Sequence, residues 1–125
     1  MIDEIAAHAR EEIPRECCGV LLGKGTEIVE SVRTRNLADD PNRYVLDPQG
    51  HIAARRAARR RGLAVVGFYH SHPDHPARPS QYDLDHAFPF FWYVIVSIQQ
   101  AQPEKMTVWR LADDRSEFRE ATLST

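Results

Sequence analysis

Two histidines and an aspartate in the middle of the chain have the spacing of a metal-binding site. His70 and His72 lie at the end of an apolar, β-branched and aromatic segment, residues 65–71, which is typical of a buried strand. Side chains alternate along a strand, so both imidazoles point to one face and Ser71 points to the other. Asp83 follows after a short loop. Two ring nitrogens and one carboxylate oxygen can hold a tetrahedral zinc ion with one position open for water.

Each half of this pattern also has a structural alternative. A pair of histidines near a strand end is more often structural than metal-binding. Ser80 and Asp83 have the spacing of a capping box, so both residues can simply start a helix. A structural role does not require the histidines, the proline-containing loop, the serine and the acid in this order, and the combination therefore favours the metal site.

Glu16 is the best candidate for the base that a metal-activated water needs, because Asp83 is committed as a ligand. It comes immediately before a buried, glycine-containing segment. Burying a charged side chain there costs free energy unless the side chain has a functional role or a partner. If that segment pairs near the histidine strand, Glu16 lies beside the metal. The alternatives are an acid at the edge of the strand or an ion pair with Arg15 or another arginine.

Glu16, the run His70-Ser71-His72-Pro73, Ser80 and Asp83 together resemble the signature of the JAMM (MPN-plus) metalloproteases. That signature has an upstream glutamate, His-x-His, ten residues and an Asp, with a Ser three positions before the Asp, and every position is matched. The apolar segment 19–23 after the glutamate and the strand that ends in the first histidine match as well. The short chain is similar to the small stand-alone prokaryotic members.

The resemblance implies that Zn²⁺ is bound by His70, His72 and Asp83. It implies that Glu16 is the general base and that the Ser80 hydroxyl donates to the developing oxyanion. It also implies cleavage of a peptide or isopeptide bond after the C-terminal Gly-Gly of a ubiquitin-like or sulfur-carrier protein. An extended glycine-rich tail would add to a sheet edge and enter a narrow groove towards the zinc.

Two other classes of function remain open. One is a non-catalytic MPN-type scaffold that only binds partner proteins; such scaffolds commonly lack the metal ligands that this chain keeps. The other is a different zinc hydrolase, such as a deaminase, whose ligands include a Cys-x-x-Cys pair. Cys17 and Cys18 lack that spacer and are expected to be reduced thiols, at least one of them buried at a strand start.

The elements that must position these residues can be read from local patterns. A helix is expected over 2–13, with Ile2, Ile5, Ala6, Ala9 and Ile13 on one face, and a second helix from Pro48 to about residue 61. A short helix is expected from 80 to 86 or 87. Strands are expected over 16–23, 27–34, 44–46, 64–71, 91–99, 105–111 and 117–123. The fold class is α/β or α+β, a single domain with a mixed sheet between helices. The resemblance implies that this is an MPN-like domain over 1–125.

Charge and composition exclude some classes of partner. The net charge is −2 and the pI is near 6.3, which argues against a general nucleic-acid or membrane-surface role. The arginines of 55–61 are expected to form a solvated helix face, with docking of an acidic protein as the alternative. The start of the chain lacks a signal-peptide pattern and the apolar run 88–98 is too short for a bilayer, so a cytoplasmic protein is expected.

Overall fold

The computed structural model describes residues 1–99 and 104–121. These residues form the helices α1 (Ile2–Glu12), α2 (Pro48–Arg60) and α3 (Gln81–His86). They also form the strands β1 (Cys18–Lys24), β2 (Glu27–Thr34), β3 (Ala64–Pro73), β4 (Trp92–Ile98), β5 (Lys105–Leu111) and β6 (Phe118–Ala121). Among these helices, none has the length and apolar character needed to cross a bilayer.

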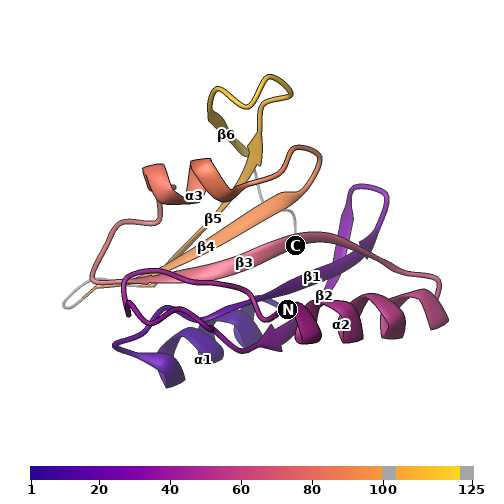
Figure 1. Ribbon diagram of the computed structural model, residues 1–125, viewed down its shortest axis with the longest axis horizontal. Helices are drawn as coiled ribbons and strands as arrows, with labels where there is room; N and C mark the ends of the chain where they lie inside the picture. Colours follow the sequence, from indigo (N-terminus) through magenta and orange to yellow (C-terminus); the bar gives the residue numbers. More distant parts are fainter. Residues whose placement is uncertain (100–103, 122–125) are drawn as a thin grey trace.

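The strands form one mixed sheet in the order β2-β1-β3-β4-β5-β6 (Figure 1). All neighbouring strands are antiparallel except β3 and β4, which are parallel. A parallel pair needs a crossover connection, and here the crossover contains the proline-rich loop and α3. The histidines therefore lie at the end of a central strand, and the crossover that leaves this strand also contains Asp83. The predicted α+β class with a mixed sheet is confirmed.

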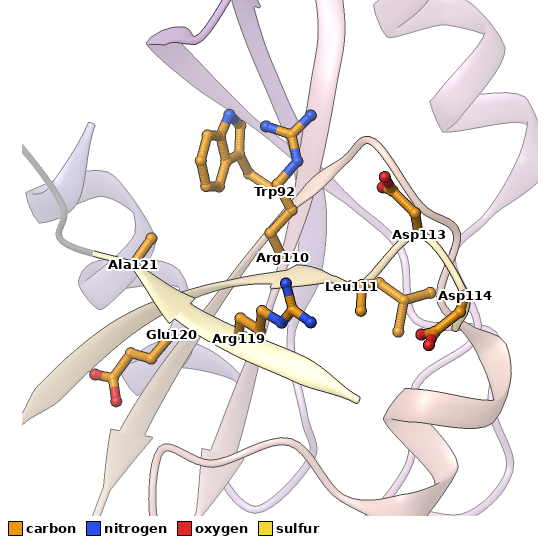
Figure 2. A pocket seen from close by; sticks show the side chains of 9 residues that line it. Trp92, Arg110, Leu111, Asp113, Asp114, Arg119, Glu120 and Ala121 are labelled. Carbon is orange, nitrogen blue, oxygen red and sulfur yellow. The ribbon is translucent and has the colours of Figure 1, made fainter. Parts of the chain in front are cut away.

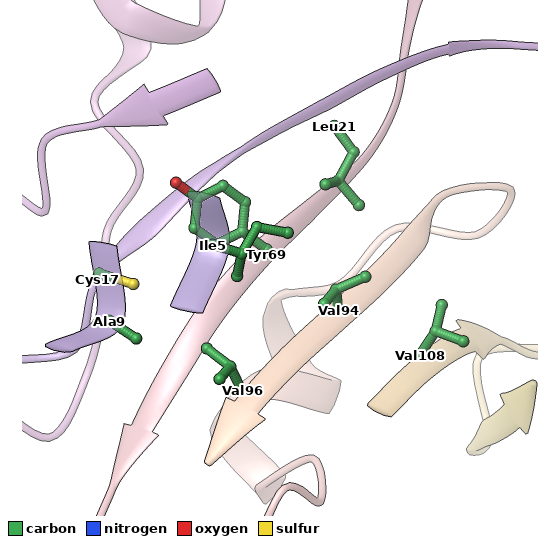
Figure 3. Close-up of a cluster of buried hydrophobic side chains, with 8 residues drawn as sticks. All are labelled: Ile5, Ala9, Cys17, Leu21, Tyr69, Val94, Val96 and Val108. Atoms are coloured by element: carbon green, nitrogen blue, oxygen red, sulfur yellow. The ribbon is translucent and has the colours of Figure 1, made fainter. Parts of the chain in front are cut away.

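Helices cover both faces of the sheet. On one face, α1 packs over a core built from α1 and the strands β1, β3, β4 and β5, which Figure 3 shows; its buried residues are Ile5, Ala9, Cys17, Leu21, Tyr69, Val94, Val96 and Val108. On the other face, a second core lies between α2, the end of α3 and the sheet; its buried residues are Val20, Ala54, Phe68, Ala87, Tyr93 and Leu111. Consecutive strand residues alternate between the two cores, as the period of a strand requires.

Two local predictions are wrong. Residues 44–46 do not form a strand, because the Asn36 side chain replaces a strand partner: its Oδ1 accepts from the N–H of Val45, and only one isolated bridge forms, between Asn36 and Leu46. Ile13 lies beyond the end of α1 in extended backbone and is exposed. His8 takes a buried place on the helix instead, where its Nδ1 lies 2.7 Å from the Tyr69 hydroxyl.

The other boundaries agree with expectation to within a few residues. β3 continues to Pro73, two residues past the prediction, because His72 and Pro73 pair with Ser97 and Ile98 of β4. Gly62 ends α2 with a positive φ of 73°, and its N–H donates to Arg59 while that of Leu63 donates to Ala58. The predicted last strand extended to residue 123, and its residues 122 and 123 lie outside the described residues.

The close approach of β1 to Tyr69 predicts a strong effect of Gly19→Ala on stability. A Cβ at position 19 would lie 2.1 Å from Cε2 of Tyr69 and 2.4 Å from the carbonyl oxygen of Val32, closer than any real contact. Because strand and ring must then move, we expect the free energy of unfolding to fall by roughly 1–3 kcal/mol. Urea unfolding checks this, and an unchanged midpoint would mean that the ring does not rest on Gly19.

Candidate metal centre

Three side chains converge at the end of β3, as the alternation of a strand predicts. Nε2 of His70 lies 3.0 Å from Nε2 of His72, and each of these nitrogens lies 3.2 Å from Oδ2 of Asp83. All three side chains are buried. Ser71 is on the opposite face of the strand, hydrogen-bonded to the N–H of Cys17. One nitrogen or oxygen atom from each of the three predicted ligands thus points at one place.

The spacing of these atoms fits a small tetrahedral metal ion. Ligand atoms that lie 2.0–2.1 Å from a tetrahedral zinc ion are about 3.3 Å from one another. The observed separations of 3.0–3.2 Å are close to that value. A carboxylate oxygen and two imidazole nitrogens at such short range repel unless a proton or a cation lies between them. The donor set and its spacing therefore fit zinc.

The two imidazoles are oriented by different partners. Nδ1 of His72 lies 2.9 Å from the carbonyl oxygen of Pro76, which can only accept, so Nδ1 bears the hydrogen and Nε2 keeps a lone pair in the neutral ring. Nδ1 of His70 is buried and has no hydrogen-bond partner among the described residues. Instead, the Tyr44 ring stacks on His70 at a centroid distance of 4.4 Å and an interplanar angle of 21°. Tyr44 was not predicted to belong to the site.

The stacking predicts that Tyr44 supports metal affinity by holding the His70 ring in place. We expect Tyr44→Leu to weaken zinc binding on the order of tenfold, the lower end of what a lost orienting partner costs. Tyr44→Phe keeps the ring and should bind zinc like the wild type. Competition titration with a chromophoric chelator measures both. Equal affinities for the leucine and phenylalanine variants would show that the ring does not orient His70.

Ser80 and Asp83 form the predicted capping box at the start of α3. The N–H of Asp83 donates to Oγ of Ser80 at 3.0 Å, and the N–H of Ser80 donates to Oδ2 of Asp83 at 2.9 Å. The structural alternative is therefore present, but it does not compete with the metal site. The same capping contacts fix the carboxylate beside the two imidazoles, and the Ser80 hydroxyl hydrogen stays free to donate.

Glu16 is brought to the histidines by the pairing of β1 with β3. Cys17 and Ser71 exchange two hydrogen bonds, from Cys17 N–H to Oγ of Ser71 at 2.8 Å and from Ser71 N–H to the Cys17 carbonyl at 3.1 Å. One carboxylate oxygen of Glu16 and one ring nitrogen of each histidine all lie within 4.8 Å of one another. Glu16 is buried, and no ion pair to an arginine forms within the described residues.

The segment between β2 and α2 holds the backbone of Glu16. The N–H of Glu16 donates to the carbonyl of Pro41 at 3.1 Å, and its own carbonyl accepts from Nδ2 of Asn36 at 2.9 Å. Nδ2 of Asn36 also donates to Arg43, and its Oδ1 accepts from Ala38. Asn36 and Tyr44 make this segment one wall of the site.

Their surroundings shift the pKa values of the two carboxyl groups in opposite directions. Burial raises the pKa of Glu16 to about 8, so this group holds and releases a proton near neutral pH. Burial also works to raise the pKa of Asp83, but its contacts with His70 and His72 outweigh this effect and keep it well below its usual range. Burial lowers the pKa of His70, which favours the neutral ring that a metal requires. Asp83 thus suits a ligand, and Glu16 suits a proton carrier.

Other reactive side chains are less well placed. His75 is exposed, and its ring centroid lies 6.5 Å from that of His72. Cys17 and Cys18 are buried free thiols, as predicted, and burial raises their pKa values to about 12 and 11, so neither forms a reactive thiolate. His86 stacks on Tyr82 at the exposed side of α3.

A largely apolar cavity of about 300 Å³ opens beside Asp83. Its lining comes from the segment after β2, the start of α2, β3, α3 and β4, and includes Tyr44, Leu46, His51, Phe68, Asp83 and Phe88. A second cavity of about 490 Å³ is lined mainly by residues of β5, β6 and the turn that joins them, and contains none of the predicted site residues (Figure 2). The first cavity therefore adjoins the candidate metal centre.

Comparison with known proteins agrees with the geometry. Residues 1–112 match the family model described as prokaryotic homologs of the JAB domain. The chain is 35% identical to a desampylase of Haloferax volcanii, with 98% of this chain and 89% of that protein covered. It is 32% identical to a CysO-cysteine peptidase of Mycobacterium tuberculosis, with 90% and 80% covered.

A solved structure supports the fold. The JAB1/MPN domain protein from Archaeoglobus fulgidus superposes with a TM-score of 0.62 at 22% identity, with 98% of this chain and 90% of that one covered. This likeness concerns the architecture of the sheet and helices. Together with the family match over nearly the whole chain, it establishes that this protein belongs to the family of prokaryotic JAB-domain homologs.

Proposed function

We propose that the protein is a zinc-dependent peptidase that cleaves the bond after the C-terminal Gly-Gly of a ubiquitin-like or sulfur-carrier protein. The observation that carries this proposal is the convergence of His70, His72 and Asp83 with the protonatable Glu16 beside them. The names of two relatives, a desampylase and a CysO-cysteine peptidase, support a substrate of this class.

The residues divide the reaction between them. A zinc ion bound there would supply Lewis-acid chemistry at the scissile carbonyl and an activated water at neutral pH. His70, His72 and Asp83 would hold the ion. Glu16 would accept a proton from the attacking water and return it to the leaving amine, because its carboxyl group lies beside the two histidines. The free hydrogen of the Ser80 hydroxyl would donate to the developing oxyanion, a contribution of about 3–4 kcal/mol in comparable sites.

An extended tail can reach the centre along the segment 44–46. The N–H and C=O of Val45 bond to Asn36 and Leu37, so the corresponding groups of Tyr44 and Leu46 point the other way. No hydrogen bond to those four groups is present among the described residues. Tyr44 and Leu46 also line the cavity beside Asp83. A glycine-rich strand could pair with this edge, because glycines fit where side chains would clash.

Cleavage of defined fusions tests the proposal. Each substrate is a ubiquitin-like protein whose C-terminal Gly-Gly is joined to a reporter, either through a peptide bond or through a lysine isopeptide bond. The control substrates end in Ala-Ala in place of Gly-Gly. We expect zinc-loaded protein to cut only the Gly-Gly fusions and to lose activity with a chelator. If the purified protein contains no stoichiometric metal and cuts none of these fusions, the scaffold function is favoured instead.

A further inference from the structure

The loop between β3 and α3 is tied to the sheet through three consecutive backbone carbonyl groups. The carbonyl oxygens of residues 75, 76 and 77 each face a hydrogen-bond donor on the sheet, and the donors are, in this order, the side chains of Ser97, His72 and Thr107. The contacts of His72 and Thr107 measure 2.9 and 2.7 Å. Because His72 is one of the three donors, a movement of this loop also moves the carbonyl that orients the His72 ring.

The three donors come from three neighbouring strands and lie on one face of the sheet. His72 of β3 pairs with Ser97 of β4, and Ile95, two residues before Ser97, pairs with Thr107 of β5. Paired residues, and residues two apart on one strand, point to the same side. Ser97 and Thr107 are buried. Burying a hydroxyl costs free energy unless it is hydrogen-bonded, and the loop carbonyls supply these bonds.

Thr107 is itself oriented by Trp109. Nε1 of Trp109 donates to Oγ1 of Thr107 at 2.7 Å. An indole N–H can only donate, so the Thr107 oxygen accepts this hydrogen and its own hydroxyl hydrogen goes to the Ala77 carbonyl. The two bonds therefore run in one direction, from the half-buried indole on β5 to the loop, which Thr107 could not reach with a freely rotating hydroxyl held by nothing else.

Hydrogen bonds rather than close packing hold this side of the loop. A cavity of about 520 Å³ lies beside it, and its lining includes Pro76, Ala77, Ser97, Thr107 and Trp109. Among the described residues, it shares no lining residue with the cavity beside Asp83. Because the loop borders open space here, packing does not make up for a lost bond, and the backbone of residues 75–77 is free to shift.

We propose that Thr107, oriented by Trp109, is a positioning residue for the metal centre. Its bond to Ala77 fixes the loop that presents the Pro76 carbonyl, and this carbonyl keeps the ring hydrogen of His72 on Nδ1 and the lone pair on Nε2, where a metal ion needs it. Thr107 lies more than thirty residues from His72 in the sequence and touches no ligand. The inference rests on the proposed function, because it requires zinc at the site.

Zinc affinity of the full chain tests the proposal without cleavage. Thr107→Val replaces the hydroxyl by a methyl group of similar size, and we expect the affinity to fall about tenfold, at the lower end of what a lost outer partner costs. Thr107→Ser keeps the hydroxyl and should bind zinc like the wild type. Thr26→Val makes the same substitution in the exposed turn between β1 and β2 and is the matched control. Competition titration with a chromophoric chelator measures all four proteins.

A spectroscopic measurement separates positioning from a general loss of stability. In the zinc-loaded wild type, the Nδ1–H of His72 should exchange slowly with water, because the Pro76 carbonyl accepts its hydrogen. We expect faster exchange in Thr107→Val and wild-type exchange in Thr107→Ser. Proton NMR of protein labelled with ¹⁵N-histidine follows this signal. A lower melting temperature of Thr107→Val with unchanged affinity and exchange would assign Thr107 to folding alone.

The remaining outcomes also decide. An equal loss of affinity in Thr107→Ser and Thr107→Val would overturn the inference, because the hydroxyl would not be the group that acts. If Thr107→Val does not fold, Trp109→Phe removes only the indole donor; it should weaken zinc binding by a smaller factor, and unchanged affinity would overturn the inference. A wild type that binds no zinc would overturn the proposed function together with this inference, whereas zinc binding that is indifferent to Thr107→Val would overturn this inference alone.

Discussion

Glu16→Gln is expected to lower the turnover of a Gly-Gly fusion by about 10²–10⁴-fold, the contribution of a positioned general base. The amide has the size of the carboxylate but cannot accept a proton, so the zinc content should stay near that of the wild type. Single-turnover cleavage, with metal content measured by atomic emission on the same sample, checks both parts. The exposed Glu27→Gln on β2 is a control for loss of an acid and should keep full activity.

The same variant separates two roles for Glu16. Its carboxylate lies within 4.8 Å of the ring nitrogens of His70 and His72, so this trio could itself hold an ion. Asp83 is nevertheless closer, at 3.2 Å from both nitrogens, and stays ionised, which makes it the better ligand. If Glu16→Gln lost its zinc together with its activity, Glu16 would be a ligand, and full turnover would exclude it from either role.

His70→Ala and Asp83→Asn are expected to lose zinc. One of three protein ligands supplies a large part of a binding free energy of about 10 kcal/mol or more, so we expect affinity to fall on the order of 10²-fold at least. Activity should fall in parallel. Isothermal titration with zinc, after chelator treatment, measures the affinity. His75→Ala removes an exposed imidazole near His72 and is the matched control that should still bind zinc.

Asp83→Asn decides between the capping and the ligand roles of this residue. Asparagine can still accept from the N–H of Ser80, so the start of α3 should survive. It cannot supply the negative charge. An asparagine variant with normal zinc affinity would show that Asp83 serves only the helix, whereas loss of zinc with an intact circular dichroism spectrum would establish the ligand role.

Local sequence patterns predicted most of the elements because alternation and helical spacing are properties of a few consecutive residues. The common direction of His70 and His72 followed from the period of a strand, and the capping box followed from the spacing of Ser80 and Asp83. The end of β3 was less predictable. Its last two residues are strand only because β4 pairs beside them, and the local sequence of residues 64–73 does not predict that pairing.

The assembly of the site depends on long-range contacts that no local pattern encodes. Glu16 reaches the histidines because Cys17 pairs with Ser71, more than fifty residues away. The motif resemblance supplied this expectation; spacing alone left it open. Tyr44 was missed because residues 44–46 alone do not show that Asn36 bonds this segment back on itself and brings the ring onto His70. A hint was the apolar run 44–46 just before a helix, which was interpreted as a strand.

The two faces of the sheet perform separate tasks. The α1 face is a mainly apolar core whose buried polar contact joins His8 to the Tyr69 hydroxyl, whereas His70, His72 and Asp83 lie on the side of the sheet covered by α2 and α3. Protein engineers can therefore redesign the interior beneath α1 to raise heat tolerance while the machinery across the sheet is left alone. The bond pair between Cys17 and Ser71 links the α1 side to Glu16 and the histidines, so it should be kept in any library.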